Sequence, residues 1–478
     1  MSLKKQLTIM WFRQDLRLKD NPALHAACEA GQVLPIFIDD DTAPRPIGGA
    51  SRWWLHHSLN ALNKSLNQQL RVFKGSPLAI LKALIAETGA QSVVWNRCYE
   101  PWQIARDKEI KAALKAQGVA VNSYQANLLW EPWTLLNKTG TPYKVFTPYY
   151  RKGCLQAPAP REVLPAPSFD DRLYVEATAE ALNIGDLALI PDIPWYNEMA
   201  QQWVPGEEGA ADNLSRFLSR PVERYDTARD KPSVKGTSRL SPHLHFGEIS
   251  PNQVWYAVFS QVEGTLDNNR DRYLSEIGWR EFSYYLLYHF PELPQKNFNP
   301  RFDAYPWKGE NSDLAAWQKG QTGVPIIDAG MRELWQTGYM HNRVRMIVGS
   351  YLVKNLGIHW HHGEAWFWDC LLDADMAANA ASWQWVAGSG ADAAPFFRIF
   401  NPVLQGEKFD KQGAYVRRYC PELKDLADKY IHSPWLAPSE ELERAGVTLG
   451  KTYPKPLVDL KASRQSALDG YEAVKNSG

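Results

Sequence analysis

A polar side chain and a tryptophan lie close together at two places in this chain of 478 residues. Glu276 lies three residues before Trp279, and Asn379 lies four residues before Trp383. If both stretches are helical, each pair shares one helix face and presents a hydrogen-bonding group beside an indole. Such a face suits the binding of flat rings with polar edges. Aromatic residues that only fill a helical core would give the same spacing.

Small hydroxyl side chains and an arginine occupy residues 236–242, with the sequence Gly-Thr-Ser-Arg-Leu-Ser-Pro. Hydroxyl and backbone N–H groups at such a turn suit phosphate oxygens, and arginine adds a charge-assisted hydrogen bond. An ordinary helix cap by serine or threonine would use the same residues.

Two arginines, Arg343 and Arg345, are two residues apart, which on a helix separates them by roughly 200°. They cannot serve one face, so one could meet an external anion while the other pairs internally, with Asp373 as the candidate partner of Arg345. Asn342 and Met346 share a face that combines a polar group with an adaptable thioether. A solvated helix with a surface ion pair would look the same.

Aromatic and basic residues alternate over residues 394–402, followed by Gln-Gly-Glu-Lys at 405–408. This pattern suits a nucleic-acid backbone with stacked bases, and it suits a buried hairpin equally well. The five cysteines are scattered and form no pair or cluster with metal-ligand spacing. They indicate a reducing compartment and no metal site.

The overall composition limits the possible functions. The chain carries 53 basic and 53 acidic residues, so any DNA site must be a local basic patch. Its 20 tryptophans favour stacking platforms or electron-transfer relays. No secretory or transmembrane segment is evident, which predicts a soluble cytoplasmic protein with no membrane association.

Short apolar runs that alternate with amphipathic stretches predict a parallel sheet with crossover helices in the first 130 residues. The predicted strands are 7–12, 33–38, 70–73, 92–95 and 119–123, and the predicted helices are 53–68, 78–88 and 103–117. No Gly-x-Gly-x-x-Gly follows the first strand, so the standard dinucleotide fingerprint is absent.

The later parts of the chain have a different texture. Prolines crowd residues 131–205, which predicts a long connection over the surface. Predicted helices then follow at 213–219, 251–261, 271–289, 314–318, 325–337, 342–356 and 363–372. The predicted architecture is an N-terminal parallel-sheet α/β (Rossmann-like) domain at 1–130, a linker at 131–205 and a C-terminal all-helical domain at 206–478.

These motifs, taken in order, resemble the photolyase/cryptochrome flavoprotein family, and they are most similar to microbial photolyases that repair cyclobutane pyrimidine dimers. The matching segments are 11–21, 143–149, 237–242, 276–282, 340–346 and 373–408, and the resemblance runs from about residue 7 to about residue 430.

The resemblance implies a U-shaped FAD in the helical domain. The residues implied at its phosphates and sugars are Tyr225, Arg229, Thr237, Ser238, Arg239, Leu240 and Ser241. Those implied around the isoalloxazine are Arg345, Asp373, Asp375 and Asn379. Asn379 matches the position beside flavin N5, where an amide can accept the N–H bond and favour reduced flavin. Plant-type photoreceptors are expected to carry Asp there and animal-type ones Cys.

The activity implied is light-driven repair of DNA, in which photoexcited reduced FAD gives one electron to a flipped-out dimer, the ring opens and the electron returns. The implied dimer pocket comprises Glu276, Trp279, Asn342, Met346 and Trp385, with Glu276 bonding the base carbonyls. The residues implied to grip the DNA phosphates are Arg343, Arg398 and Lys408. Trp383, Trp360 and Trp307 match a relay that carries electrons from the surface to oxidised flavin, although plain core packing would also explain Trp307 and Trp360.

The chain departs from the family pattern at the antenna site. Folate-binding members are expected to carry an Asn-Glu pair where this chain has Pro101 and Trp102. Trp102 could stack on a methenyltetrahydrofolate or a deazaflavin, with Glu100 bonding a ring N–H, or Trp102 could fill an empty site. A folate in a different pose is the preferred interpretation.

The resemblance thus implies a monomeric photolyase that acts on pyrimidine dimers. The alternatives are a blue-light photoreceptor (cryptochrome), a (6-4) photolyase and a DNA-binding module with a structural flavin. Asn379, Met346 and the short stretch after about residue 437 argue against the photoreceptor. A (6-4) enzyme is expected to carry two histidines where this chain has one, His341.

Overall fold

The computed structural model describes residues 6–393 and 397–476. The described chain divides into two compact units. Unit 1 contains the residues up to 194 together with 203–219 and 238–291, and unit 2 contains 195–202, 220–237 and the residues from 292 onward. No helix within these described ranges is long and apolar enough to span a membrane.

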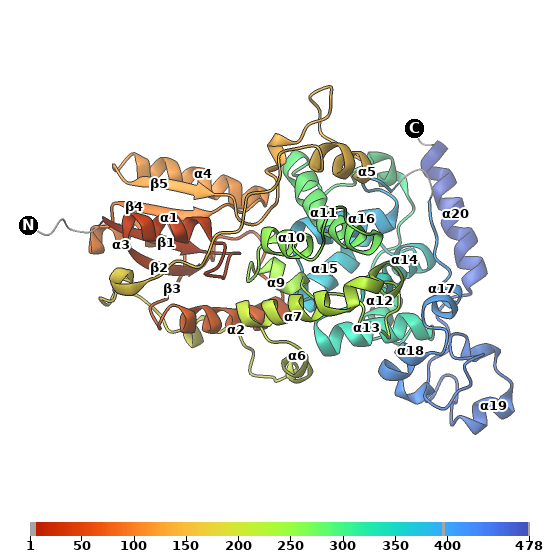
Figure 1. Cartoon of the computed structure of the whole chain (residues 1–478). Coiled ribbons are helices and arrows are strands. Elements are labelled where there is room, and N and C mark those ends of the chain that lie inside the picture. The colour runs from red at the N-terminus through yellow and green to blue at the C-terminus, as the bar shows by residue number, and fades with distance from the viewer. Residues whose placement is uncertain (1–5, 394–396, 477–478) are drawn as a thin grey trace, which may run out of the picture. The chain divides into compact units, whose positions relative to one another are not determined.

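A five-stranded parallel sheet forms the centre of the N-terminal part of unit 1, as the sequence predicts (Figure 1). Its strand order is β3-β2-β1-β4-β5, so the direction of the crossovers reverses between β1 and β4. The strands are β1 (Gln6–Phe12), β2 (Gly31–Asp39), β3 (Arg71–Lys74), β4 (Ser92–Asn96) and β5 (Ala120–Tyr124). Every residue of β1 after Gln6 is buried, as expected of a strand covered on both faces.

The three predicted crossover helices are present. They are α2 (Gly49–Ser65), α3 (Pro77–Thr88) and α4 (Pro101–Lys115). Compared with the prediction, α2 begins four residues earlier, α3 one residue earlier and α4 two residues earlier. A further helix that the prediction missed, α1 (Pro22–Ala30), connects β1 to β2. It begins with proline in its first turn and is capped by Asn21, whose side chain accepts a hydrogen bond from the N–H of Leu24.

The proline-rich stretch from 131 to 194 lacks long helices and runs partly along the sheet. The N–H of Tyr174 donates to the carbonyl of Val33, and that of Leu182 donates to the carbonyl of Val72. The stretch also holds a short helix, α5 (Phe146–Pro148), that continues into a π-helix, η2 (Tyr149–Cys154). After it come α6 (Asn197–Gln202) and α7 (Glu207–Ser219).

Most of the predicted later helices are present. They are α10 (Pro251–Phe259), α11 (Asn268–His289), α12 (Ser312–Gln318), α13 (Pro325–Thr337), α14 (Asn342–Ser350) and α15 (Trp360–Cys370). The single helix predicted over 342–356 is wrong in detail, because α14 changes after residue 350 into a π-helix, η7 (Tyr351–Leu356).

Several helices of this region fall outside the ranges predicted for it. They are the short α9 (Ser241–His245), α16 (Met376–Ala387), α17 (Pro402–Phe409), α18 (Ala414–Tyr419) and α20 (Leu460–Asn476). The Asp375 side chain caps α16 by accepting a hydrogen bond from the N–H of Ala378, and Gly388 ends the helix in the left-handed conformation.

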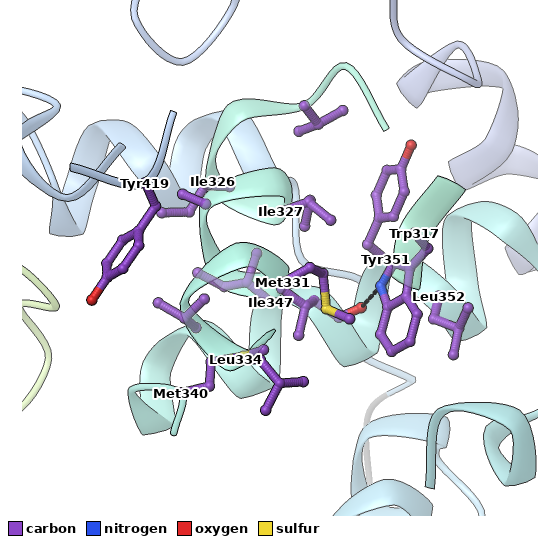
Figure 2. Packing of buried hydrophobic residues seen from close by; sticks show 14 of the residues in the cluster. Trp317, Ile326, Ile327, Met331, Leu334, Met340, Ile347, Tyr351, Leu352 and Tyr419 are labelled. Atoms are coloured by element: carbon purple, nitrogen blue, oxygen red, sulfur yellow. Dashed lines mark hydrogen bonds between the residues drawn. The ribbon is translucent and has the colours of Figure 1, made fainter. Parts of the chain in front are cut away.

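A large apolar core in unit 2 fixes α13 and α14 (Figure 2). Met331 and Leu334 of α13 pack in one cluster with Ile347 of α14 and with Trp317 of α12. The indole N–H of Trp317 donates to the carbonyl of Val348, 3.1 Å away, so this fully buried ring leaves no polar atom without a partner. The core therefore holds rigidly the helix that carries Asn342, Arg343, Arg345 and Met346.

Candidate functional site

The predicted site residues form two groups, one in each compact unit. Unit 1 holds Ser238, Arg239, Leu240, Ser241, Glu276 and Trp279. Unit 2 holds Tyr225, Arg229, Thr237, Trp307, Asn342, Arg343, Arg345, Met346, Trp360, Asp373, Asp375, Asn379, Trp383, Trp385, Arg398 and Lys408.

Glu276 and Trp279 are half-buried and lie on α11, so their spacing places them on one helix face as predicted. Trp279 stacks on Phe146, with ring centroids 3.8 Å apart and planes 11° from parallel. One face of the indole is therefore covered by another ring of the same unit.

The turn at residues 238–241 has the backbone geometry of a tight loop. Arg239 adopts a left-handed conformation with φ of 54°, and Ser241 begins the short helix α9. The Arg239 guanidinium lies 4.0 Å from the ring centroid of Trp203, a cation–π contact that holds the side chain against one surface.

Gly236 brings three of the residues predicted at the FAD phosphates and sugars, all in unit 2, close together. A Cβ on Gly236 would lie 2.7 Å from the Cβ of Ala228, so only glycine allows this close approach. The approach brings Thr237 near α8 (Tyr225–Ala228) and Arg229, and the Arg229 guanidinium lies 5.5 Å from the Tyr225 ring.

Arg345 and Asp373 form the ion pair that the sequence predicts. The two guanidinium Nη atoms donate to the two carboxylate oxygens at 3.0 and 2.8 Å, and Nε donates to the carbonyl of Met340. Burial lowers the pKa of Arg345, but the Asp373 carboxylate, together with Tyr339 and Glu333, more than offsets this, so the pKa is raised overall. The bidentate pair ties α14 to the segment before α16.

Arg343 also has an internal partner, which the sequence did not suggest. Its Nη2 and Nε donate to one oxygen of Asp230 at 2.8 and 3.2 Å, and its guanidinium lies 4.5 Å from the ring of Phe409. Lys408 lies 5.0 Å from the same ring, so Phe409 brings two of the predicted phosphate-binding cations together. Arg398 is exposed, and residues 394–396 of its motif lie outside the described ranges.

The Asn379 side chain is oriented by Glu364 of α15. Its amide nitrogen donates to the backbone carbonyl of Glu364 at 3.0 Å and to the carboxylate at 2.7 Å. Because both N–H groups are engaged, the amide oxygen is left as the acceptor. Glu364 was missed by the sequence analysis, since no periodicity relates two residues that are 15 positions apart.

Two of the three predicted relay indoles are fully buried, and the third is half-buried. Trp360 and Trp383 are 0% and 3% exposed, whereas Trp307 is partly open to solvent. The His359 ring lies 5.0 Å from Trp307 and 5.5 Å from Trp360, measured between centroids. Burial, helped by nearby His361 and His362 and opposed by Asp303, lowers the pKa of His359 to about 4.

The remaining residues of the predicted dimer pocket lie on α14 and α16 of unit 2. Asn342 is exposed at the first residue of α14, and the Met346 sulfur lies 3.8 Å from an Arg343 nitrogen. Trp385 is half-buried on α16.

In the antenna region of unit 1, the Trp102 N–H donates to Glu100 at 2.6 Å, and Arg106 lies 5.0 Å from the Trp102 ring.

In the described part of the chain, no three or more His, Cys, Asp or Glu side chains are grouped so that they could hold a metal ion.

Two family models match the chain. Residues 8–168 match the DNA photolyase model, and residues 273–473 match the FAD binding domain of DNA photolyase. A deoxyribodipyrimidine photo-lyase of Agrobacterium fabrum is 50% identical over 100% of both chains. Cryptochrome-2 of Arabidopsis thaliana is 39% identical over 96% of this chain and 77% of its own length. The crystal structure of a bacterial class III photolyase from Agrobacterium tumefaciens superimposes with a TM-score of 0.96 and covers 100% of this chain and 99% of that one, at 50% identity.

The fold and the matches define a flavoprotein with a parallel α/β domain followed by a largely helical FAD-binding domain. The chain belongs to the photolyase/cryptochrome family.

Proposed function

We propose that this chain is a deoxyribodipyrimidine photo-lyase that uses blue light to repair cyclobutane pyrimidine dimers in DNA. The observation that carries the proposal is the fixed amide of Asn379. Its oxygen is presented as an acceptor because Glu364 takes both N–H groups. An acceptor suits an N–H of reduced flavin, the redox form that repair requires, whereas a carboxyl group at this position is expected of plant-type photoreceptors.

The donor set fits FAD. Hydroxyl groups of Thr237, Ser238 and Ser241 and the guanidinium groups of Arg229 and Arg239 suit the diphosphate and the sugars. The Arg345–Asp373 pair would lie at the isoalloxazine edge, with Asp375 holding the start of α16. When bound and reduced, FAD supplies the light-driven electron that opens the cyclobutane ring and is then recovered.

The substrate residues divide into walls, hydrogen-bonding groups and cations. Trp279 and Trp385 would offer flat apolar walls to a flipped dimer, while Glu276 and Asn342 bond the edges of the bases, beside Met346. Arg343, Lys408 and Arg398 would contact phosphates, and with no net charge on the chain this patch carries the DNA affinity.

The residues 1–130 would form the antenna-type domain and 206–478 the catalytic domain, joined by 131–205. A folate such as methenyltetrahydrofolate, or a deazaflavin, would bind at Trp102 as antenna. Chromophores released from the purified protein and identified by mass spectrometry test this assignment, and the absence of any second chromophore would contradict it. We further propose that the enzyme acts as a cytoplasmic monomer on dimer-containing DNA.

A repair assay tests the proposed function. Reduced protein is incubated with oligonucleotides that carry either a thymine dimer or a (6-4) photoproduct, in blue light and in darkness. Light-dependent loss of the dimer alone is the expected result. Repair of the (6-4) product would identify the other photolyase class, and repair of neither lesion by a flavin-loaded protein would identify a photoreceptor.

A variant tests the role of Glu276. Glu276→Ala should lower the quantum yield of repair and leave the flavin content unchanged. An unchanged yield would remove Glu276 from the proposed mechanism.

A further inference from the structure

The motif at residues 143–149 matches the family but has no part in the function proposed above. The structure places one of its residues, Phe146, flat against Trp279, and both belong to unit 1. The ring centroids are 3.8 Å apart and the ring planes are 11° from parallel, so the two rings are closely stacked.

Phe146 also contacts a second aromatic ring. Its ring is nearly parallel to that of Tyr150, at 5.5 Å and 9°, and Phe146 is only 8% exposed. The π-helix η2 carries Tyr150, and a Cβ on Gly278 would lie 2.6 Å from the Tyr150 ring. The residue before Trp279 is therefore glycine because the Tyr150 ring lies directly against the backbone of α11. Rare π-helical turns such as η2 are frequent at functional sites.

Phe146 covers one face of the Trp279 indole, and Trp279 as a whole is only half-buried. Phe282 contacts the same indole only edge-on, at 5.9 Å and 74°. A tryptophan fixed on one face loses less side-chain freedom when a ligand stacks on its open surface, which strengthens binding without a new contact.

We propose that Phe146 is a positioning residue for lesion binding, which fixes the Trp279 indole as a preformed wall for the flipped dimer. The inference rests on the proposed role of Trp279 as that wall.

The test measures the affinity of the full-length, FAD-loaded protein in darkness for an oligonucleotide with one thymine dimer and for its undamaged counterpart. Phe146→Leu should weaken dimer binding by about threefold to tenfold, the range given by the loss of one aromatic pair, and leave undamaged DNA unaffected. Phe146→Tyr keeps a flat ring and should retain most of the affinity.

A double-mutant cycle with Trp279→Leu separates positioning from general packing. Phe146→Leu should have no further effect once Trp279 is gone, whereas a merely structural role would weaken binding in both backgrounds. Phe282→Leu is the matched control, because it removes a buried ring of the same size that meets the indole by its edge; it should lower thermal stability but change dimer affinity less.

Two results would overturn the inference. One is that Phe146→Leu binds the dimer oligonucleotide as tightly as the wild type does, although Trp279→Leu binds it weakly. The other is an equal loss from Phe146→Leu with and without Trp279. If Trp279→Leu itself binds the dimer normally, the wall role assigned in the proposed function fails as well, and that outcome is distinguishable from the first two.

Discussion

The tryptophans at the sheet and those in the helical domain are buried beside different neighbours. At the sheet, the Arg13 guanidinium lies 4.8 Å from the Trp11 ring and 5.7 Å from Trp95, and Arg106 lies 4.9 Å from Trp11. In the helical domain the rings of the three predicted relay tryptophans contact other aromatic rings and imidazoles instead. Across residues 6–393 and 397–476, no arginine or lysine lies over them.

The difference matters for electron transfer. An indole that gives up an electron becomes positively charged, and a lone cation about 5 Å away raises its energy by about 3 kcal/mol at an effective dielectric constant near 20. The Asp107 carboxylate, which pairs with both arginines, offsets part of this increase at the sheet. The indoles beside Arg13 and Arg106 are therefore suited to packing. Those in the helical domain are free of this penalty, which favours the relay proposed for them.

The largest expected effect follows from removing one indole of the relay. Trp383→Phe should lower photoreduction of oxidised flavin by about tenfold or more, because the phenyl ring is much harder to oxidise. Repair by pre-reduced protein should be unchanged. Trp317→Phe is the control, since Trp317 is equally buried and lies 6.2 Å from Trp383 but is not assigned to the relay. Normal photoreduction in Trp383→Phe would show that electrons take another route.

Removal of a cation at the sheet should affect stability. Arg13→Met removes a buried guanidinium whose Nη1 donates to both oxygens of Asp107, at 2.9 and 2.7 Å, and should destabilise the fold by about 3 kcal/mol in urea unfolding. Photoreduction should be unaffected. Lys111→Met, which removes a half-exposed cation 5.5 Å from Trp95, should cost less than about 1 kcal/mol. Equal losses from both variants would contradict this distinction between the two cations.

A cation introduced into the relay should reproduce the unfavourable environment of the sheet. His359→Arg places a permanent charge beside Trp307 and Trp360 and should slow photoreduction by about threefold to tenfold. His359→Gln, which has no charge, should behave like the wild type. If both variants slow the reaction equally, shape and not charge is responsible.

The smallest expected effect is a flat pH profile. The pKa of His359 is lowered to about 4 by burial, so the ring is neutral between pH 5.5 and 8 and photoreduction should not vary in this range. As the pH falls toward 4, the ring takes up a proton and photoreduction should slow. The unfolded chain binds that proton near pH 6.5, so this group also makes the fold less stable as the pH falls below 6.5. A change centred near pH 6.5 in the photoreduction rate would contradict the burial argument.

The elements of the fold follow from local patterns in the sequence. Apolar runs bounded by turn residues located all five strands. Both stretches with a polar residue near a tryptophan are helical, so Glu276 with Trp279 and Asn379 with Trp383 share helix faces as expected for that case, although the range of α16 was not among the predicted helices. Helix α1 was missed, although Asn21 followed by Pro22 is a typical helix start. The π-helix η7 has no periodicity of its own and was read as a continuation of α14.

The sequence by itself determined the five strands, many of the helices, the family and one ion pair, Arg345 with Asp373. Only the tertiary structure decided the partners that orient the site: Glu364 for Asn379, Asp230 for Arg343, and Phe146 for Trp279. Arg343 and Asp230 are 113 positions apart, for example. Helical and strand periodicities report which face a residue occupies, but which distant segment packs against that face depends on how the whole core is filled.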